Sequence, residues 1–129
     1  MIVLDSAAAV DYLARLGPGD WVAEQILADP DLHAPHLIDV EVIGALRRLV
    51  SAGALVAARA RRALEDLRDL DVVRYGHLPF LERMWQLRAH VTMSDAAFVA
   101  LAEALGATLV TTDRKLAGAH GLRSTVLAP

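Results

Sequence analysis

The stretch Met1-Ile2-Val3-Leu4-Asp5-Ser6 decides the fold of this protein. A short apolar run without polar alternation is typical of a strand buried on both faces of a parallel sheet. We expect it to be the central strand, with Asp5 at its carboxyl end, where open α/β sheets bind their ligands. Residues 108–113 (TLVTTD) repeat the arrangement near the other end of the chain. Two buried strands that each end in a carboxylate indicate a functional site at that edge of the sheet.

The rest of the chain alternates between short β-like runs and helical periodicity, without linkers, repeats or low-complexity segments. Such alternation predicts an α/β fold with a three-layer arrangement around a mostly parallel sheet, formed by one domain that spans residues 1–129. Ser6 and Ser94 are the expected caps of the first and the most regular helix. The further strands are expected at residues 32–34, 72–75 and 125–127, and the helices at 7–16, 20–27, 37–49, 55–70, 78–88, 95–105 and 114–119.

Composition excludes several classes of function. The 129 residues carry a net charge of −3, whereas a nucleic-acid binder usually carries positive charge, so phosphate binding here requires a local basic patch or bound cations. The absence of cysteine excludes disulfides, thiolate catalysis and cysteine-type zinc sites. We predict a cytoplasmic protein without a membrane segment, because neither a signal peptide nor an 18-residue apolar run is present. The hydrophobic content of 55% leaves apolar surface for a partner.

Four carboxylates are the candidates for chemistry. Asp5 and Asp113 end two strands, Asp95 lies in the first turn of its helix, and Glu41 lies among apolar residues of the helix expected at 37–49. Burying a lone carboxylate is costly, so such acids indicate a polar site. Hard divalent cations such as Mg²⁺ prefer oxygen ligands, and a cluster of acids that holds them can hydrolyse a phosphodiester.

Each acid also has a structural interpretation. Asp95 is suited to complement the helix dipole, and Asp113 is suited to a turn. Asp39 is expected to serve the first turn of its helix, and Glu103 is expected to be solvated. Asp5 is the hardest of the four to explain structurally, because a core strand seldom ends in an acid for the sake of stability.

Other chemical signals are weaker. His33 and His36 have the spacing of metal ligands but lack an evident third partner. No nucleophile elbow and no glycine-rich phosphate loop is present. Arg114 and Lys115 adjoin Asp113 and are therefore the basic residues best placed to contact a substrate phosphate.

Four segments together resemble the PIN-domain ribonucleases in order and spacing. They are residues 2–6 (IVLDS), 40–48 (VEVIGALRR), 94–103 (SDAAFVALAE) and 109–116 (LVTTDRKL). The short chain without additional domains is similar to the VapC toxins of bacterial toxin–antitoxin pairs. The resemblance spans essentially the whole chain and implies a five-stranded sheet of order 3-2-1-4-5, in which the strands that end at Asp5 and Asp113 are neighbours.

The resemblance also implies an activity, a cofactor and partners. It implies Mg²⁺-dependent endoribonuclease activity, with Mn²⁺ as a possible substitute, a homodimer, and inhibition by a VapB-type antitoxin. Carried over by position, the acidic site consists of Asp5, Glu41, Asp95 and Asp113, with Ser6 and Thr111 as supporting hydroxyls. Asp5, Asp95 and Asp113 would hold an ion, and Glu41 would be an outer ligand or the base that orients water. Many relatives carry a further acid where this chain has Leu116 and Ala117, so the number of ions stays open.

Two other classes of protein compete with a nuclease. A phospho-accepting receiver domain is also a small α/β module with Mg²⁺-binding acids, but it needs an acidic pair after the first strand and a lysine after the fifth. Here Asp5 stands alone and Lys115 follows Asp113. A catalytically silent PIN-like adaptor that only binds RNA or protein is the second alternative, and the presence of all four acids argues against it.

Overall fold

The five strands form one parallel sheet in the order β3-β2-β1-β4-β5 in the computed structural model, which describes residues 1–129. This confirms the predicted strand order, with the opening stretch at the centre. The strands are β1 (Ile2–Leu4), β2 (Leu32–Pro35), β3 (Val72–Tyr75), β4 (Thr108–Val110) and β5 (Val126–Leu127). All three residues of β1 are buried, as its uninterrupted apolar run predicts.

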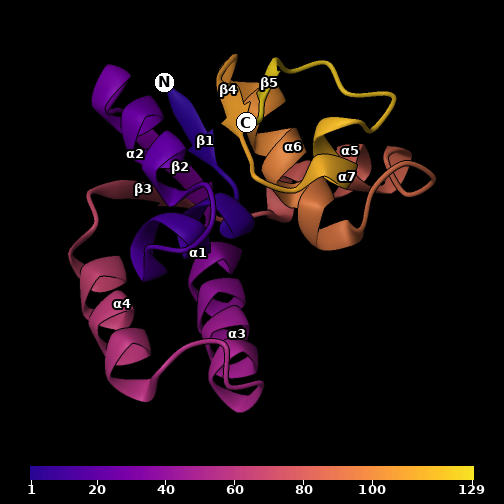
Figure 1. Ribbon diagram of the computed structural model, residues 1–129. Coiled ribbons are helices and arrows are strands. Elements are labelled where there is room, and N and C mark those ends of the chain that lie inside the picture. The colour runs from indigo at the N-terminus through magenta and orange to yellow at the C-terminus, as the bar shows by residue number, and fades with distance from the viewer.

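Helices cover both faces of the sheet, so the expected three layers are present (Figure 1). The helices that connect β1, β2 and β3 lie on one side: α1 (Ser6–Ala14), α2 (Gly19–Ala28), α3 (Leu37–Ser51) and α4 (Ala57–Asp69). The other side carries a 3₁₀ turn (Leu78–Phe80), α5 (Leu81–Gln86), α6 (Met93–Leu105) and α7 (Arg114–Ala117). This arrangement follows from right-handed crossovers, because the strand order reverses direction after β3. No helix of the protein is long and apolar enough to cross a bilayer.

The core lies between the sheet and two well-buried helices. In α6 every residue from 96 to 102 is buried, and the alanines among them let the helix approach β1, β2 and β4 closely. On the other face α1 packs against α2, α3 and α4. Gly19 is required at the start of α2, because an added Cβ would lie 2.3 Å from the carbonyl oxygen of Asp11.

The register of the sheet sets the position of the site. Leu4 pairs with Val110, and the Asp5 amide donates to the Val110 carbonyl at 3.0 Å. The residues that follow β1 and β4, Asp5 and Thr111, therefore emerge side by side at the carboxyl edge. This is the edge at which the chain connections reverse, the switch point of an open α/β sheet.

Some predicted helix ends were wrong. The first helix ends at Ala14, because Arg15 adopts a left-handed conformation with φ of 55°, before the expected breaker at Gly17. Ser94 does not cap α6. Thr92 does, since its hydroxyl accepts from the Asp95 amide. No side chain caps α1, so the assignment of Ser6 as its cap was also wrong.

Candidate active site

Asp5 is the buried centre of the candidate site. Only 2% of the residue is exposed, Thr111 Oγ1 donates to its Oδ2 at 2.6 Å, and its Oδ1 has no hydrogen-bond partner. Burial raises the pKa of Asp5 from its ordinary value of 3.8 to about 6, against the hydrogen bond from Thr111, and the charges of Asp95 and Glu41 add to the rise. A carboxyl group this poorly compensated is expensive for the fold, which is typical of functional sites.

Glu41 repeats this situation on α3. Its Oε1 is buried and has no hydrogen-bond partner. Burial raises the pKa of the Glu41 carboxyl and the charge of Asp95 raises it further, while the Arg48 charge and a hydrogen bond with Ser6 lower it. Ser6 thus acts on Glu41 instead of capping its own helix, because the first turn of α1 faces α3.

Asp95 lies in the first turn of α6 and has both a structural and an electrostatic role. Its amide donates to Thr92 Oγ1 at 3.2 Å. Burial raises the pKa of Asp95, a hydrogen bond from Thr92 opposes the rise, and the Asp113 charge adds to it. The helix start explains where Asp95 lies, but the N-terminal end of a helix alone would favour its ionised form. The raised pKa therefore reflects burial among other acids.

Asp113 joins the site through the hydroxyl of Thr111. That hydroxyl donates to Asp5 and accepts from the Asp113 amide at 3.0 Å, so one side chain fixes both strand ends. One carboxylate oxygen of Asp113 accepts from the Lys115 amide at 2.8 Å and caps α7. The expected turn chemistry of Asp113 is present, alongside its position near Asp95.

The four acids influence one another but do not line one cavity. Asp95 and Asp113 line a cavity of about 560 Å³, and Ser6 and Glu41 line another of about 500 Å³. Asp5 lines neither, although its pKa responds to the charges of both Asp95 and Glu41. The expectation that all four acids face a common space is not met, because Asp5 is almost completely buried at the sheet edge.

The residues are chemically suited to a hard cation. Carboxylate oxygens are the preferred ligands of Mg²⁺, and those of Asp5 and Glu41 that lack a donor are oriented but unneutralised. No three acidic or histidine side chains lie close enough together to ligate one ion. Mg²⁺ is usually held by one or two carboxylates and several waters, so two acids of this group suffice for a site.

Several polar residues have other roles than the sequence indicated. Glu103 was expected to be solvated, but its carboxylate accepts from Arg83 Nε at 2.7 Å and from a second guanidinium nitrogen at 3.0 Å. Asp39 was expected to serve its own helix, but it forms a two-pronged ion pair with Arg74 at 2.8 Å. The weak histidine pair is not a metal site either, since His33 bonds Tyr75 and Asp31 instead. The partners Arg83, Arg74 and Tyr75 lie 20, 35 and 42 residues away in sequence, so they leave no local signal.

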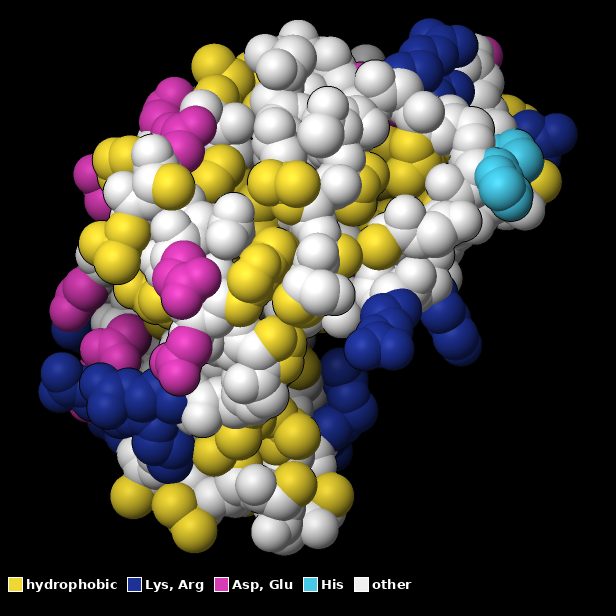
Figure 2. Space-filling model, turned by 45° about the horizontal axis from the view of Figure 1, so that its top comes forward, with side chains coloured by type: hydrophobic (Ala, Val, Ile, Leu, Met, Phe, Trp, Pro, Cys, Tyr) yellow, Lys and Arg dark blue, Asp and Glu magenta, His cyan; other side chains and the backbone are white.

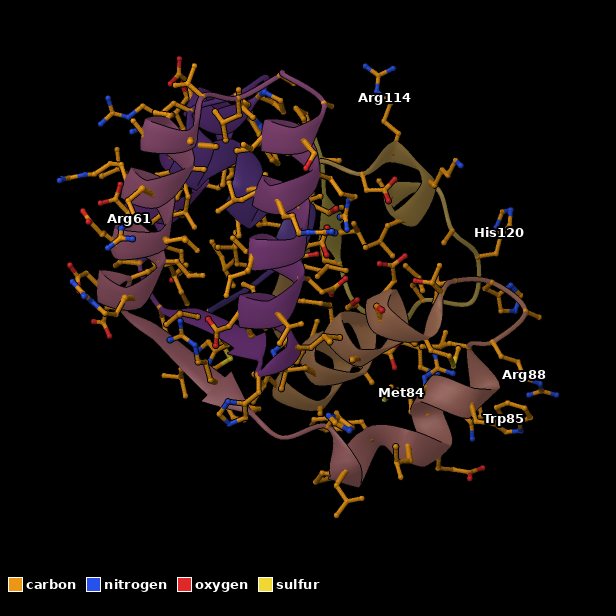
Figure 3. All side chains as sticks on the ribbon, turned by 90° about the horizontal axis from the view of Figure 1, so that it is seen from below. Arg61, Met84, Trp85, Arg88, Arg114 and His120 are labelled. Atoms are coloured by element: carbon orange, nitrogen blue, oxygen red, sulfur yellow. The ribbon has the colours of Figure 1, made fainter.

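The two predicted phosphate contacts differ in position. Lys115 lines the cavity that contains Asp95 and Asp113. Arg114 points away from α5, on the far side of α7 (Figure 3), and does not line this cavity. The sequence did not reveal Arg88 and His90, which line the cavity beside Lys115. They lie between helices in the chain, without a motif around them.

The strand order and the acids at the carboxyl edge of the sheet define an α/β protein with an acidic site at its switch point. Comparison with known proteins identifies the family. A model of the PIN domain matches residues 2–121, so the chain belongs to the PIN-domain family. Among solved structures, PAE2754 from Pyrobaculum aerophilum superposes with a TM-score of 0.72 at 23% identity, over 98% of this chain and 87% of that one. VapC20 of Mycobacterium tuberculosis, described as a sarcin-ricin loop cleaving toxin, superposes with a TM-score of 0.66 at 15% identity, over 95% of this chain and 96% of that one.

Curated relatives narrow the assignment within that family. VapC ribonuclease Mb0985 of Mycobacterium bovis is 46% identical over 116 residues, which cover 90% of this chain and 88% of that protein. Ribonuclease VapC1 of Mycobacterium tuberculosis is 46% identical over 121 residues, which cover 93% and 91%. The chain is a VapC-type PIN protein. A phospho-accepting receiver domain is thereby ruled out.

Proposed function

We propose that this protein is a divalent-metal-dependent endoribonuclease toxin that hydrolyses phosphodiester bonds of RNA. The observation that carries the proposal is the group of unneutralised carboxylates at the carboxyl edge, with buried unpartnered oxygens on Asp5 and Glu41 and a raised pKa of Asp5, Glu41 and Asp95. The names of its relatives, which describe ribonucleases, support the reaction type.

Two carboxylates of the group Asp5, Asp95 and Asp113 would hold Mg²⁺ or Mn²⁺ directly, and the third would act with Glu41 through bound water. A bound divalent cation supplies a nucleophilic hydroxide at neutral pH and neutralises charge on the phosphate. The acids contribute negative charge that is fixed before the ion arrives, so little reorganisation accompanies binding.

The neighbouring hydroxyls orient these acids. Thr111 donates to Asp5 Oδ2 and so holds the carboxylate with Oδ1 as the oxygen without a partner. Ser6 forms a hydrogen bond with the Glu41 carboxyl, and Glu41 Oε1, which has no partner, would accept a proton from an attacking water. The raised pKa of Glu41 brings its basicity closer to what proton transfer near neutral pH requires.

Substrate binding falls to the cationic residues of the cavity. Lys115 is proposed to contact a substrate phosphate, and Arg114 is a weaker candidate because its side chain points away from the cavity. A net charge of −3 makes such local positive charge necessary for any approach of RNA.

The partners are proposed to be a VapB-type antitoxin, which neutralises the toxin, and a second copy of the chain in a homodimer. Exposed apolar side chains support a protein interface at α3 and α4. Val40 on α3 and Val56, directly before α4, are both 70% exposed. A strict monomer at tens of micromolar by light scattering would contradict the homodimer.

The decisive experiment is cleavage by the purified protein in chelator, in Mg²⁺ and in Mn²⁺, followed by sequencing of RNA 5′ ends after brief induction in cells. We expect cleavage only with a metal ion and at a small set of sites. Binding of RNA without cleavage in any metal would identify the chain as a catalytically silent PIN-like adaptor instead.

A further inference from the structure

A tryptophan lies on the surface close to the candidate site. Trp85 on α5 is 61% exposed, a large exposed fraction for an aromatic side chain of this size. The guanidinium carbon of Arg88 lies 4.5 Å from the centroid of the indole ring, and Arg88 Nη1 donates to the Trp85 carbonyl at 2.9 Å. Figure 3 shows the two side chains next to each other at the outer end of α5. Trp85 and Arg88 form a stacked cation–π pair, which we call the Trp85–Arg88 stack.

The Trp85–Arg88 stack is linked to the proposed catalytic acids through Arg88, whereas Trp85 lies outside their cavity. Arg88 lines the same cavity as Asp95 and Asp113, together with His90 and Lys115. One cavity therefore carries the acids on one part of its wall and cationic side chains on another. An anionic substrate needs this combination, because acids alone would repel a phosphate.

The face of the molecule in Figure 2 also shows an uneven distribution of charge. In Figure 2 most carboxylates gather on the left, the side of α2 and α4, although arginines lie below them. The right side, where the last third of the chain lies, carries mainly Lys, Arg and His. Because the protein has a net charge of −3, such local positive charge favours the approach of a polyanion to this side.

The support beneath Trp85 is fixed. Arg83, one half-turn earlier in α5, bonds Glu103 of α6 and also donates to the Gly121 carbonyl at 2.8 Å. Gly121 in turn has φ of +81°, and a Cβ there would come within 3.1 Å of the His90 ring. The loop around residue 121, α5 and His90 therefore hold one another in place, so the Trp85–Arg88 stack is presented by a rigid surface.

We propose that the Trp85–Arg88 stack binds an unpaired base of the RNA substrate next to the phosphate that is cleaved. Aromatic rings and guanidinium planes stack on splayed-out bases of single-stranded RNA, whereas the bases of a duplex are not accessible to them. The substrate class that fits this surface is thus a single-stranded or loop segment of RNA. This inference rests on the proposed ribonuclease function and specifies its substrate.

The competing occupant of this surface is another protein. Leu81, four residues before Trp85 on α5, is 50% exposed and would suit an apolar interface. RNA is favoured because the guanidinium of Arg88 lies over the indole and Arg88 also lines the cavity of Asp95 and Asp113. An apolar partner would have to desolvate Arg88, which forms no ion pair in this structure.

Fluorescence tests the stacking directly, since the chain has only two tryptophans. Trp21→Phe leaves Trp85 as the sole emitter, and the matched variant Trp85→Phe leaves Trp21, which lies on α2 across the sheet. The probe is a 2′-O-methyl oligonucleotide in chelator, which neither needs a metal ion nor is cleaved. We expect the single strand to quench Trp85 strongly and Trp21 hardly at all, and a duplex of the same sequence to quench neither. Equal quenching of the two variants, or none, would overturn the proposal.

Kinetics separates binding from folding. Trp85→Ala is expected to raise KM for a single-stranded RNA about 5- to 100-fold, with a smaller change in kcat, as loss of one stacked base implies. Trp85→Phe should keep KM close to the wild-type value, because phenylalanine can still stack on a base. Leu81→Ala, the control on the same helix, should change KM less than about 2-fold. An equal effect of Leu81→Ala, or dissociation of an oligomer by Trp85→Ala, would assign the surface to a protein partner and overturn the proposal.

The fluorescence and cleavage experiments together also distinguish this inference from the proposed function. If the oligonucleotide quenches Trp85 but the protein cleaves no RNA with any metal ion, the stacking site is supported and the nuclease function is contradicted. Cleavage by the wild type without quenching of Trp85 would leave the nuclease intact and overturn the stacking site.

Discussion

Two groups of charged side chains, one around Asp5 and Asp95 at the start of α6 and one around Glu103 near its end, are built in opposite ways. Around Glu103, two guanidinium nitrogens of Arg83 and the Arg123 amide supply donors at 2.7–3.0 Å, and these contacts lower the pKa of Glu103. Around Asp5, burial and the neighbouring acids outweigh the hydrogen bonds from the Thr111 hydroxyl and the Ser6 amide, and the pKa of Asp5 rises to about 6.

The difference separates a structural role from a functional one. The Glu103 cluster satisfies each charge and joins α5, α6 and the loop at residues 121–123, so it stabilises the fold. The Asp5 cluster keeps oxygens unpartnered and like charges close together, which costs stability. A cluster that costs stability is retained in a fold when it binds something, and here the proposed occupant is a divalent cation.

The largest expected effect of breaking the acid cluster is on RNA cleavage. Asp95→Asn removes one charge at nearly constant shape, and we expect the cleavage rate to fall by about two to four orders of magnitude, the scale of losing a positioned catalytic group. In chelator its free energy of unfolding should stay unchanged or rise by about 0.5–2 kcal/mol, because a repulsive charge is removed. A single-turnover assay and thermal melts measure the two. A variant clearly less stable than the wild type in chelator would show that Asp95 is only a helix-start residue.

The second effect concerns pH and stability. The pKa of Asp5 is higher in the folded protein than its ordinary value of 3.8, so the fold binds this proton more tightly than the unfolded chain does. The stability that this proton contributes is therefore fully present below about pH 4 and is lost as the pH rises to about 6. Across that range the free energy of unfolding of the metal-free protein should fall by about 3 kcal/mol. Urea unfolding from pH 4 to 7 in chelator measures it. Asp5→Asn should flatten this dependence, and an unchanged slope in the variant would contradict the assignment.

The third prediction tests the Glu103 cluster, in which the carboxylate has its hydrogen-bond donors. Arg83→Met keeps most of the side-chain length but leaves Glu103 without its ion pair, and we expect a loss of about 1.5–3 kcal/mol in the free energy of unfolding, the range for hydrogen bonds to charged groups. Arg68→Met is the matched control, because the Arg68–Asp69 pair is exposed on α4. Urea titration of both variants makes the comparison. Equal losses in the two would contradict a structural role of the Glu103 cluster.

The smallest effect is stabilisation by the ion itself. Mg²⁺ at ten times its dissociation constant should raise the stability of the wild type by about 1.4 kcal/mol through preferential binding to the folded state. Asp95→Asn should gain much less, whereas Arg68→Met should gain as much as the wild type. Thermal melts in chelator and in millimolar Mg²⁺ measure this. Equal gains in the wild type and Asp95→Asn would place the ion elsewhere.

The sequence by itself determined the strand order, the class of fold and the family. The apolar run at residues 1–4 and the short β-like run at residues 108–111 are typical of strands in a parallel sheet, and four short motifs in register across the chain identify the PIN domain. Asp5, Asp95 and Asp113 could be placed near the same sheet edge because each follows a strand or begins a helix, which are local features. The pairing of Leu4 with Val110 agrees with that placement.

Only the tertiary structure decided which charges are neutralised. Glu103 and Asp39 have the same chemistry as Asp5, yet they find Arg83 and Arg74 at 20 and 35 residues' distance, whereas Asp5 Oδ1 finds no donor. The Trp85–Arg88 stack and its cavity likewise depend on how α5, α6 and α7 pack together. Secondary structure follows from neighbours in the chain, but the pKa of a carboxyl depends on burial and on charges within a few ångströms, and folding alone brings those charges together.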